Sequence, residues 1–368
     1  MRTKLPPALL LAAVLAAAAL PGASSRPARP EAAPPVRGVW MHPGFFGPDE
    51  TAALAKMRTT LDAYARSGIN TLIMLVKNTS GHVYYASDIG VRDAAWTWDF
   101  FGAFLAEART RGMDVHPWFC VFPETALLGR VREHPEWLIS SPRREMIATA
   151  NPALPAVRAY ETSLMLELVR MYDVGWIHLD YIRYPCEPAE PAFSFDPETL
   201  RLFKAETGID MAAIKARDTG NLAWTEWLRW NTDRVTLFVR ELRAALAGAG
   251  RPVKVSAAVF PDPVSARVMI GQDWAAWARE GLVDMLNPML YTNDARLFEK
   301  LAREAVAIGG GRVLVCPGIG IGTSHNRNTP DGMAGQMAVS RALGADGVVF
   351  FSSGSLDGPF LDKLAAGR

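Results

Sequence analysis

The sequence has few of the residues that usually hold metal ions or cross-link small domains. It contains three cysteines, Cys120, Cys186 and Cys316, and six histidines in 368 residues. The cysteine spacings fit no zinc-binding pattern, and neither HxH nor HExxH occurs. We therefore expect no metal and no other cofactor. Three unpaired buried thiols are the favoured interpretation, and a disulfide between Cys120 and Cys186 stays open.

An excess of charge of either sign is also absent. The chain has 39 Lys and Arg against 38 Asp and Glu, a formal net charge of +1, so no nucleic-acid partner is expected. No GxGxxG follows the first predicted strand, which weighs against a dinucleotide-binding sheet. With 49% hydrophobic and 21% charged residues, the composition is typical of a globular protein with a large core.

The N-terminus has the pattern of an export signal. In "MRTKLPPALLLAAVLAAAALPGASS" two basic residues precede an apolar run that ends in small residues. The run is shorter than the roughly 20 residues of a membrane span, so a retained anchor is the less favoured alternative. We predict a cleaved signal peptide over 1–23, a flexible Pro- and Ala-rich leader over 24–36 and one folded domain over 37–368, in an exported periplasmic or extracellular protein without stable membrane insertion.

Short β-rich runs alternate with helical stretches along the rest of the chain. Helical spacing is clear, for example, in "ETAALAKMRTTLDAYARSG". The predicted strands lie at 37–44, 70–78, 113–123, 174–185, 253–261, 284–291, 312–322 and 346–355. Eight such units favour an α/β fold closed into a (β/α)8 TIM barrel over an open sheet. The connection between the fourth and fifth strands, about 186–248, is enlarged.

Polar residues stand at the ends of almost all of these strands, which fold stability does not require. In a TIM barrel the active site lies at the carboxyl ends of the strands. The candidate residues at these ends are His42, Lys77, Asn78, Glu124, Asp180, Arg183, Asp262, Asn287 and Tyr291.

The fourth strand, "VGWIHLDYIRYP", carries ionisable residues inside an apolar run. Alternation places Trp176, His178 and Asp180 on the lumen side, and Ile177, Leu179 and Tyr181 on the helix side. A carboxylate pointing into the barrel costs several kcal/mol unless it is paired or functional. A catalytic Asp180 is favoured, and a salt bridge to Arg183 or Lys77 is the alternative. Arg183 would orient Asp180 or bind substrate, and His178 would be a core histidine or a substrate ligand.

The sequence resembles the glycosyl-hydrolase-like family 10 proteins. The resemblance rests on the order and spacing of "RGVWM", "GINTLIMLVKN", "RGMDVHPWFCV", "HPEWL", "NPALPAVRAY", "YDVGWIHLDYIRYP", "DWAAWAREGLVDMLNPMLY" and "GADGVVFFSSGSL". It implies an exported TIM-barrel glycoside hydrolase acting on a bacterial glycan, either an amino-sugar polymer such as peptidoglycan strands or an exopolysaccharide. The family's strand-4 aspartate corresponds to Asp180. Many members carry two adjacent acids there, whereas Tyr181 follows Asp180 in this chain.

Glycoside hydrolysis usually needs two carboxylates, one as acid and one as nucleophile or base. Asp180 is predicted to be one of them, with Glu124 or Asp262 as its partner. A substrate-assisted route, in which a 2-acetamido group attacks, also stays open. The predicted substrate-binding residues are His42, Lys77, Asn78, His178, Arg183, Asn287 and Tyr291. A glycan-binding barrel that has lost catalysis and a metal-dependent hydrolase are the alternatives.

Overall fold

The structure is a computed structural model that describes residues 34–143, 145–186, 193–211 and 220–367. The predicted signal peptide over 1–23 and the leader up to residue 33 lie outside the described residues, and both stay predictions. The first strand begins at Val36, close to the predicted start of the domain.

Each of the eight predicted strand regions contains a strand. The seventh region holds two short pieces, with Pro317 between them, which has no N–H to donate to a neighbouring strand. The barrel strands are β1 (Val36–Met41), β2 (Thr71–Lys77), β5 (Asp114–Cys120), β8 (Trp176–Asp180), β9 (Lys254–Val259), β10 (Met285–Pro288), β11 (Leu314–Val315), β12 (Gly318–Gly320) and β13 (Gly347–Phe351).

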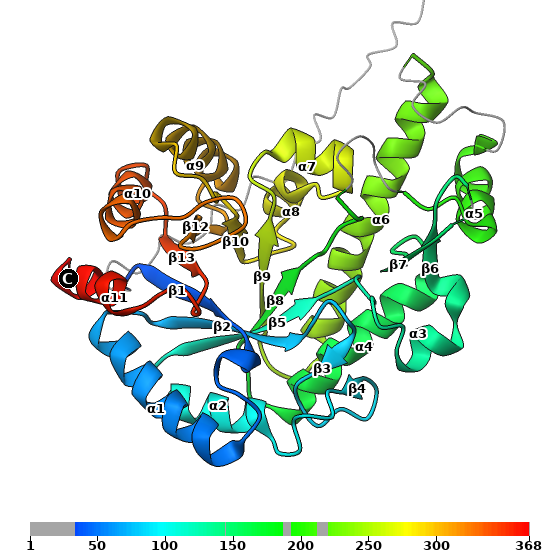
Figure 1. The fold of residues 1–368 in the computed structure, drawn as a ribbon. Helices are drawn as coiled ribbons and strands as arrows, with labels where there is room; N and C mark the ends of the chain where they lie inside the picture. The colour runs from blue at the N-terminus through cyan, green and yellow to red at the C-terminus, as the bar shows by residue number, and fades with distance from the viewer. Residues whose placement is uncertain (1–33, 144, 187–192, 212–219, 368) are drawn as a thin grey trace, which may run out of the picture.

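The barrel strands are parallel, and their order in the sheet is their order in the chain (Figure 1). β1 pairs with β2 on one side and with β13 on the other. The segment from β11 to β12 completes the ring: Cys316 N donates to Leu286 O of β10 at 2.9 Å, and Val349 N of β13 donates to Pro317 O at 3.0 Å. The predicted α/β class and TIM-barrel architecture are confirmed.

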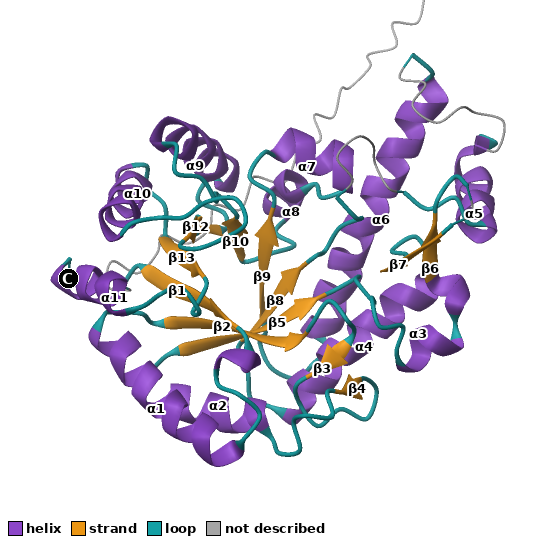
Figure 2. Ribbon diagram, in the orientation of Figure 1, coloured by secondary structure: helices purple, strands orange, loops and turns teal. Residues whose placement is uncertain are grey.

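Helices surround the strands (Figure 2). They present apolar residues to the sheet at helical spacing, as α1 does with Ala53, Met57, Leu61 and Tyr64. The α-helices are α1 (Glu50–Arg66), α2 (Phe100–Arg109), α3 (Gly129–Glu133), α4 (Pro155–Met171), α5 (Pro197–Thr207), α6 (Leu222–Ala247), α7 (Pro263–Ile270), α8 (Trp274–Glu280), α9 (Ala295–Gly309), α10 (Pro330–Ala342) and α11 (Gly358–Ala366).

Several loops after the barrel strands carry elements of their own. β3 (His82–Val83) pairs with the end of β2 and with β4 (Val91–Arg92). β6 (Leu138–Ser140) and β7 (Met146–Ala150) form a separate antiparallel pair. The connection from β8 to β9 contains α5 and α6, but its residues 187–192 and 212–219 lie outside the described part of the chain. Its predicted enlargement therefore stays a prediction.

Two clusters of buried hydrophobic residues follow the alternation along the strands. The larger cluster lies between strands and helices and includes Ile177 and Leu179 of β8. The smaller one, which we call the lumen cluster, fills the barrel; its members are Trp40, Ile73, Leu75, Trp118, Cys120, Trp176, Ala258, Met285, Cys316 and Val349. The barrel interior is thus a packed core, and the carboxyl ends of its strands are where the active sites of TIM barrels lie.

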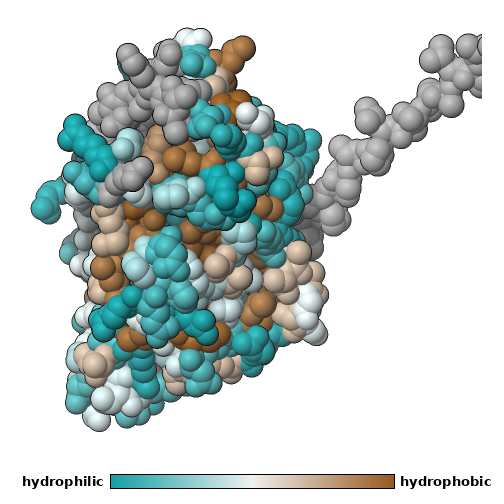
Figure 3. Space-filling view, turned by 90° about the vertical axis from the view of Figure 1, so that its right-hand side faces the viewer, coloured by the Kyte–Doolittle hydropathy of each residue, from teal (hydrophilic) through white to brown (hydrophobic). Residues whose placement is uncertain are grey.

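The surface carries no single dominant hydrophobic area on the face shown in Figure 3, where brown patches are separated by hydrophilic residues. Within the described residues, no helix combines the length and the apolar character needed to cross a membrane.

Candidate active site

Asp180 is the last residue of β8 and lies on the lumen side at the carboxyl end of the barrel. Trp176, four residues earlier, belongs to the lumen cluster, and the ring of His178 contacts Trp40 of the same cluster. Ile177 and Leu179 pack against the helices. The orientation predicted for this strand is therefore confirmed from Trp176 to Asp180.

The Asp180 carboxyl group lies in a low-polarity setting. The residue is 6% exposed, and Oδ1 accepts a 2.6 Å hydrogen bond from the Tyr181 backbone N–H. Burial raises its pKa to about 6; the Arg183 charge, the Tyr181 N–H and the Trp118 indole lower the pKa by less. The Trp118 indole N–H makes no hydrogen bond of good geometry within the described residues. A carboxyl group with a pKa near 6 can donate a proton close to neutral pH.

Tyr181 leaves the strand path immediately after Asp180. Its φ of 48° lies in the left-handed region, which non-glycine residues rarely adopt. The predicted helix-side position of Tyr181 is wrong: the left-handed turn redirects the chain, and the Tyr181 ring packs against the lumen cluster. Strained backbone of this kind concentrates at functional sites.

Arg183 lies between two aromatic rings beside Asp180. Its guanidinium carbon is 4.5 Å from the ring centroid of Tyr181 and 4.8 Å from that of Phe260. The charge of Arg183 lowers the pKa of Asp180, but among the described residues the two side chains form no direct ion pair. The structure therefore does not show the alternative arrangement, in which Asp180 would form a salt bridge with Arg183.

Aromatic side chains continue around the mouth from Trp118. The His42 ring is 4.9 Å from the Trp118 ring between centroids, and burial lowers the pKa of His42. Phe351 lies 6.5 Å from Trp118 and 5.4 Å from Tyr291. The pKa of Tyr291 is raised well above its usual value, mainly by burial and further by the charge of Asp180. Of the predicted site residues, His42, Arg183 and Tyr291 are thus brought together with Asp180.

Lys77 faces the helices rather than the mouth. A β-bulge between Leu75 and Lys77 adds one residue to β2, so that Leu75 is level with lumen-facing Trp118 and Lys77 is level with Phe119. Phe119 packs against the helix-side core. Because side chains alternate with a period of two, one extra residue moves Lys77 to the opposite face.

Glu124 belongs to a buried cluster with Lys77 and Glu161 of α4. Lys77 Nζ lies 2.7 Å from a Glu124 carboxylate oxygen and 3.1 Å from Glu161. Burial raises the pKa of Glu161 to about 8 against the opposing effect of Lys77. Glu124 is 1% exposed, and a Cβ atom at Gly81, whose φ is +91°, would lie 2.1 Å from its Oε2. The structure thus encloses Glu124 instead of presenting it at the mouth.

Asp262 caps a helix. Its carboxylate accepts a 2.7 Å hydrogen bond from the Ser265 backbone N–H at the start of α7. This hydrogen bond is the main reason that its pKa is lowered. An Asp in that position stays ionised and is held by the helix N-terminus. A catalytic role for Asp262, like one for Glu124, stays a prediction.

His178 lies one layer below Asp180 in a buried hydrogen-bond chain. Its Nε2 accepts from the Trp40 indole at 3.1 Å, and its Nδ1 lies 2.9 Å from Ser256 Oγ, which also contacts His116 Nδ1 at 2.9 Å. Burial lowers the pKa of His178 to about 3. The ring is therefore neutral and held in the barrel interior, and direct contact with substrate stays a prediction.

The two predicted asparagines have different surroundings. Asn78 organises the turn after β2 by accepting from the Ser80 and His82 backbone N–H groups and donating to Tyr84 Oη at 2.9 Å. Asn287 is fully buried and donates to Cys316 O at 3.1 Å, while its Oδ1 has no hydrogen-bond partner among the described residues. Unsatisfied buried polar atoms are rare, and here two of them, in Trp118 and Asn287, are in the barrel.

The comparison with known sequences identifies the family. The sequence model described as Glycosyl hydrolase-like 10 matches residues 35–323. The chain belongs to this family. It is 24% identical to glycosyl hydrolase DigH of Escherichia coli (strain K12), over 77% of this chain and 72% of that protein. It is 22% identical to glycosyl hydrolase YngK of Bacillus subtilis (strain 168), over 63% of this chain and 48% of that protein, so the match spans about half of YngK.

Solved structures of glycosidases share the fold of this Glycosyl hydrolase-like 10 chain. The PgaB (BpsB) glycoside hydrolase domain from Bordetella bronchiseptica superimposes with a TM-score of 0.68 at 18% identity, covering 90% of this chain and 98% of that domain. The catalytic domain of a β-amylase from Paenibacillus polymyxa gives 0.62 at 12% identity, with 89% and 94% covered. At such low identities, these TM-scores establish a common fold and no more.

Sequence reasoning missed the aromatic residues at the mouth of this family member. It searched the strand ends for polar groups, whereas Trp118, Phe351, Phe260 and Tyr84 are apolar or lie in loops. The signal for Trp118 was available: in "DVHPWFC" it lies in phase with His116 and Cys120, which both point into the barrel. The positions of Phe260 and Tyr84 depend on loop geometry, which alternation does not reach.

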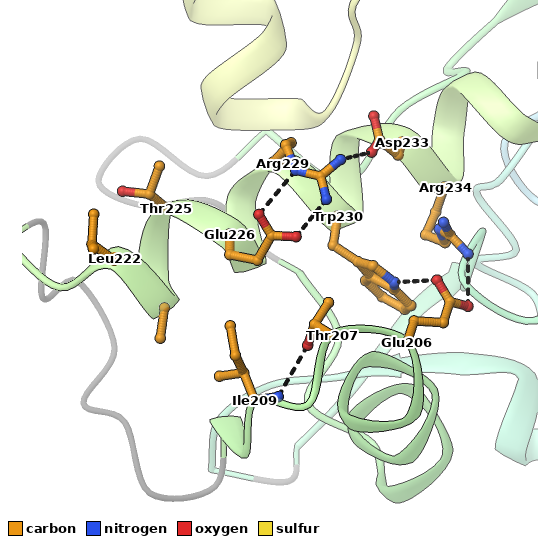
Figure 4. Close-up of a pocket in the computed structure, with 11 residues that line it drawn as sticks. Glu206, Thr207, Ile209, Leu222, Thr225, Glu226, Arg229, Trp230, Asp233 and Arg234 are labelled. Carbon is orange, nitrogen blue, oxygen red and sulfur yellow. Dashed lines mark hydrogen bonds and ion pairs between the residues drawn. The ribbon is translucent and has the colours of Figure 1, made fainter. Parts of the chain in front are cut away.

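A surface cavity lies away from the carboxyl ends of the barrel strands. The cavity, of about 580 Å³, lies between α5 and α6 (Figure 4). Its charged groups satisfy one another: Glu206 accepts from Trp230 at 2.8 Å and pairs with Arg234 at 3.2 Å, and Arg229 pairs with Glu226. Neither a barrel-strand residue nor any of the predicted site residues lines this cavity.

In the described part of the chain, no group of three His, Cys, Asp or Glu side chains could hold a metal ion.

None of the three cysteines forms a disulfide with another described residue. Cys120 lies in the lumen cluster opposite Asp180 in the β5–β8 ladder, and Cys186 is exposed. The disulfide left open between Cys120 and Cys186 is not formed, and the prediction that all three thiols are buried is wrong for Cys186.

Proposed function

We propose that this chain is a glycoside hydrolase in which Asp180 donates a proton to the glycosidic oxygen. The observation that carries the proposal is the buried carboxyl group of Asp180 at the carboxyl end of β8, in a member of the Glycosyl hydrolase-like 10 family. Burial raises the pKa of this group to about 6. Catalytic groups of TIM barrels lie at this end of the strands, and a general acid needs a pKa close to the working pH.

The aromatic residues would hold the sugar next to this acid. Trp118, Phe351 and Tyr291 form a connected set of rings around Asp180. Such rings pack against the apolar faces of sugar rings, and their low-polarity surroundings favour the protonated form of Asp180. Proton transfer from Asp180 to the bridging oxygen releases the leaving sugar as the bond to the anomeric carbon breaks.

The group that attacks the anomeric carbon would come from the substrate. The two predicted partner carboxylates are engaged elsewhere, Glu124 with Lys77 and Asp262 with the first turn of α7. In a substrate-assisted reaction the carbonyl oxygen of a 2-acetamido group attacks, and water later opens the cyclic intermediate with Asp180 as the base. We therefore propose an N-acetylated amino-sugar polymer, such as peptidoglycan strands or an exopolysaccharide, as the substrate.

A glycan-binding barrel without catalysis is the second candidate. It is favoured by the same observation, namely that neither Glu124 nor Asp262 is free to act beside Asp180. It predicts binding of oligosaccharides to the aromatic mouth without cleavage.

Product analysis separates the two candidates. Purified protein is incubated with N-acetylated glycan strands and with the same strands after de-N-acetylation, and new reducing ends are measured by colorimetry and mass spectrometry. The hydrolase proposal predicts new reducing ends from the acetylated strands and at least 100-fold fewer from the de-N-acetylated ones, in line with loss of a nucleophile. Equal cleavage of both would contradict the substrate-assisted route, and binding without any cleavage would support the second candidate.

We also propose that the protein is exported and that residues 1–23 are removed. Support comes from the charged, apolar and small-residue order of the N-terminus. N-terminal sequencing of the protein from the medium or periplasm tests it: a mature N-terminus near residue 24 is expected, and an intact Met1 in the cytoplasm would contradict it.

A further inference from the structure

The guanidinium group of Arg183, at the mouth of the barrel, forms no ion pair with any of the described residues. Arg183 is partly buried, its Nε is fully buried, and that atom has no hydrogen-bond partner among the described residues. No carboxylate of the described residues forms an ion pair with it. By contrast, Arg158, which is 5% exposed, is held by Glu241 at 2.8 Å and by two backbone carbonyls.

The two rings beside Arg183 fix the position of the guanidinium group without accepting hydrogen bonds from its N–H groups. Tyr181 and Phe260 hold the guanidinium carbon at 4.5 and 4.8 Å from their centroids. Cation–π contacts attract the charge without accepting the in-plane N–H bonds that a carboxylate accepts. A guanidinium held this way is preorganised for a planar anion, because little side-chain freedom remains to be lost on binding.

The group is also close to the reacting position. Arg183 follows Asp180 by three residues, and its charge acts directly on the Asp180 carboxyl group. The Tyr181 ring that contacts Arg183 belongs to the residue whose N–H binds Asp180. An anion bound by Arg183 would therefore sit on a sugar unit next to the bond that Asp180 protonates.

We propose that Arg183 binds a carboxylate carried by the substrate and so selects acidic over neutral glycans. The inference rests on the proposed function to the extent that the mouth binds a sugar chain. Two sources have this chemistry: the lactyl ether of a muramic acid unit and the carboxylate of a uronic acid. Arg183 is then a specificity-determining residue, with its N–H groups donating to both carboxylate oxygens.

Binding titrations with matched ligands test the inference. The first pair is N-acetylated glycan strands containing muramic acid and the same strands after reduction of the carboxyl groups to alcohols. The second pair is an oligosaccharide of alternating uronate and N-acetylhexosamine and its carboxyl-reduced form. Each ligand is titrated into the wild-type protein, Arg183→Gln and Arg303→Gln, and binding is followed by tryptophan fluorescence. Arg303→Gln is the control, because Arg303 is an exposed arginine that pairs with Glu299 on α9. Because hydrolysis would change the ligands, all three are compared in the Asp180→Asn background as well.

The wild-type protein and Arg303→Gln are expected to bind one carboxylated ligand at least 10-fold more tightly than its reduced form. In Arg183→Gln this ratio is expected to fall to about 1, while the affinity for the reduced ligand is retained. Arg183→Lys should give an intermediate ratio, because lysine keeps the positive charge but lacks the two parallel N–H donors of the guanidinium group. The pair that shows the preference identifies the source of the carboxylate.

Two results would overturn the inference: equal wild-type affinity for both members of both pairs, or an unchanged preference in folded Arg183→Gln. If Arg183 served only to adjust Asp180, its replacement would alter binding and cleavage of both members of a pair equally. Failure of the proposed function looks different, since the preference would be present while no reducing ends appeared. If Arg183→Gln does not fold, as judged by circular dichroism, the ratio measured with Arg183→Lys decides.

Discussion

Tyr181 donates its backbone N–H to the Asp180 carboxyl group at 2.6 Å while its φ is held at 48°. The turn that brings this donor to Asp180 is one that a non-glycine residue adopts at a cost of about 1 kcal/mol or more. It also carries the Tyr181 ring out of the strand direction and over to Arg183. Tyr181 thus contributes a strained backbone and a hydrogen bond to the carboxyl group of Asp180, and its ring helps to position Arg183.

The strain at Tyr181 predicts an unusual order of stabilities. Tyr181→Gly and Tyr181→Ala both lose the ring, but glycine adopts a φ of 48° without the Cβ penalty. We expect Tyr181→Gly to be more stable than Tyr181→Ala by about 1 kcal/mol, measured as the free energy of unfolding in guanidinium chloride. An alanine variant as stable as the glycine variant would show that the turn is relaxed.

The buried Asp180 carboxyl group predicts a pH-dependent stability difference. Because its pKa is raised from 3.8 to about 6, the folded protein binds more protons than the unfolded chain between these values. Its stability therefore falls as pH rises through that window, by on the order of 2–3 kcal/mol. Asp180→Asn, which is neutral throughout, should be more stable than the wild type at pH 7.5 and nearly equal to it at pH 4. Equal stability of both proteins at pH 7.5 would contradict the raised pKa.

The Lys77 cluster predicts that its members respond differently to substitution. Glu161→Gln should be tolerated near pH 7, since the raised pKa of about 8 means that Glu161 carries a proton there. Lys77→Met should cost about 3–5 kcal/mol, because it leaves the buried Glu124 carboxylate unpaired. Wild-type stability should also fall as pH rises from about 4.5 towards 8, and Glu161→Gln should lack this contribution. Thermal unfolding at pH 6 and pH 9 measures both effects; equal costs for the two variants would argue against the cluster.

The thiols predict a reactivity pattern. Cys186 is exposed, whereas Cys120 and Cys316 are buried. Burial also raises the pKa of the Cys120 thiol well above its usual value. Under native, non-reducing conditions a thiol reagent should modify Cys186 rapidly and the other two slowly, and all three should react after unfolding. Fewer than three reactive thiols in unfolded, unreduced protein would reveal a disulfide.

The sequence predicted the barrel because each strand is a short apolar run between helical stretches. It also predicted the direction of Asp180, since alternation over Trp176, His178 and Asp180 depends on local geometry alone. Lys77 was predicted to lie at the mouth because it ends the second strand, but the β-bulge after Leu75 turns its side chain toward the helices. Such a bulge depends on the partner strand, which alternation within one strand does not describe.

The surroundings of the two candidate partner carboxylates could be predicted only in part. Glu124 and Asp262 follow strands and therefore looked equivalent as partners of Asp180. In the folded chain Glu124 forms an ion pair with Lys77 of β2, which also pairs with Glu161 of α4. The carboxylate of Asp262 caps the start of α7. The contacts of Glu124 join distant segments and leave no clear pattern in the sequence. The capping role of Asp262 did have a local signal, because Pro263 follows it at the first position of α7.

The rate of glycan cleavage by Asp180→Asn tests the central proposal most directly. The measurement compares new reducing ends from N-acetylated strands for wild type and Asp180→Asn between pH 4 and pH 8, with folding confirmed by circular dichroism. We predict a loss of at least about 100-fold in Asp180→Asn, and a wild-type kcat/KM that declines as pH rises above about 6, where Asp180 loses its proton. A folded Asp180→Asn variant that cleaves at the wild-type rate would contradict the assignment of Asp180 as the acid.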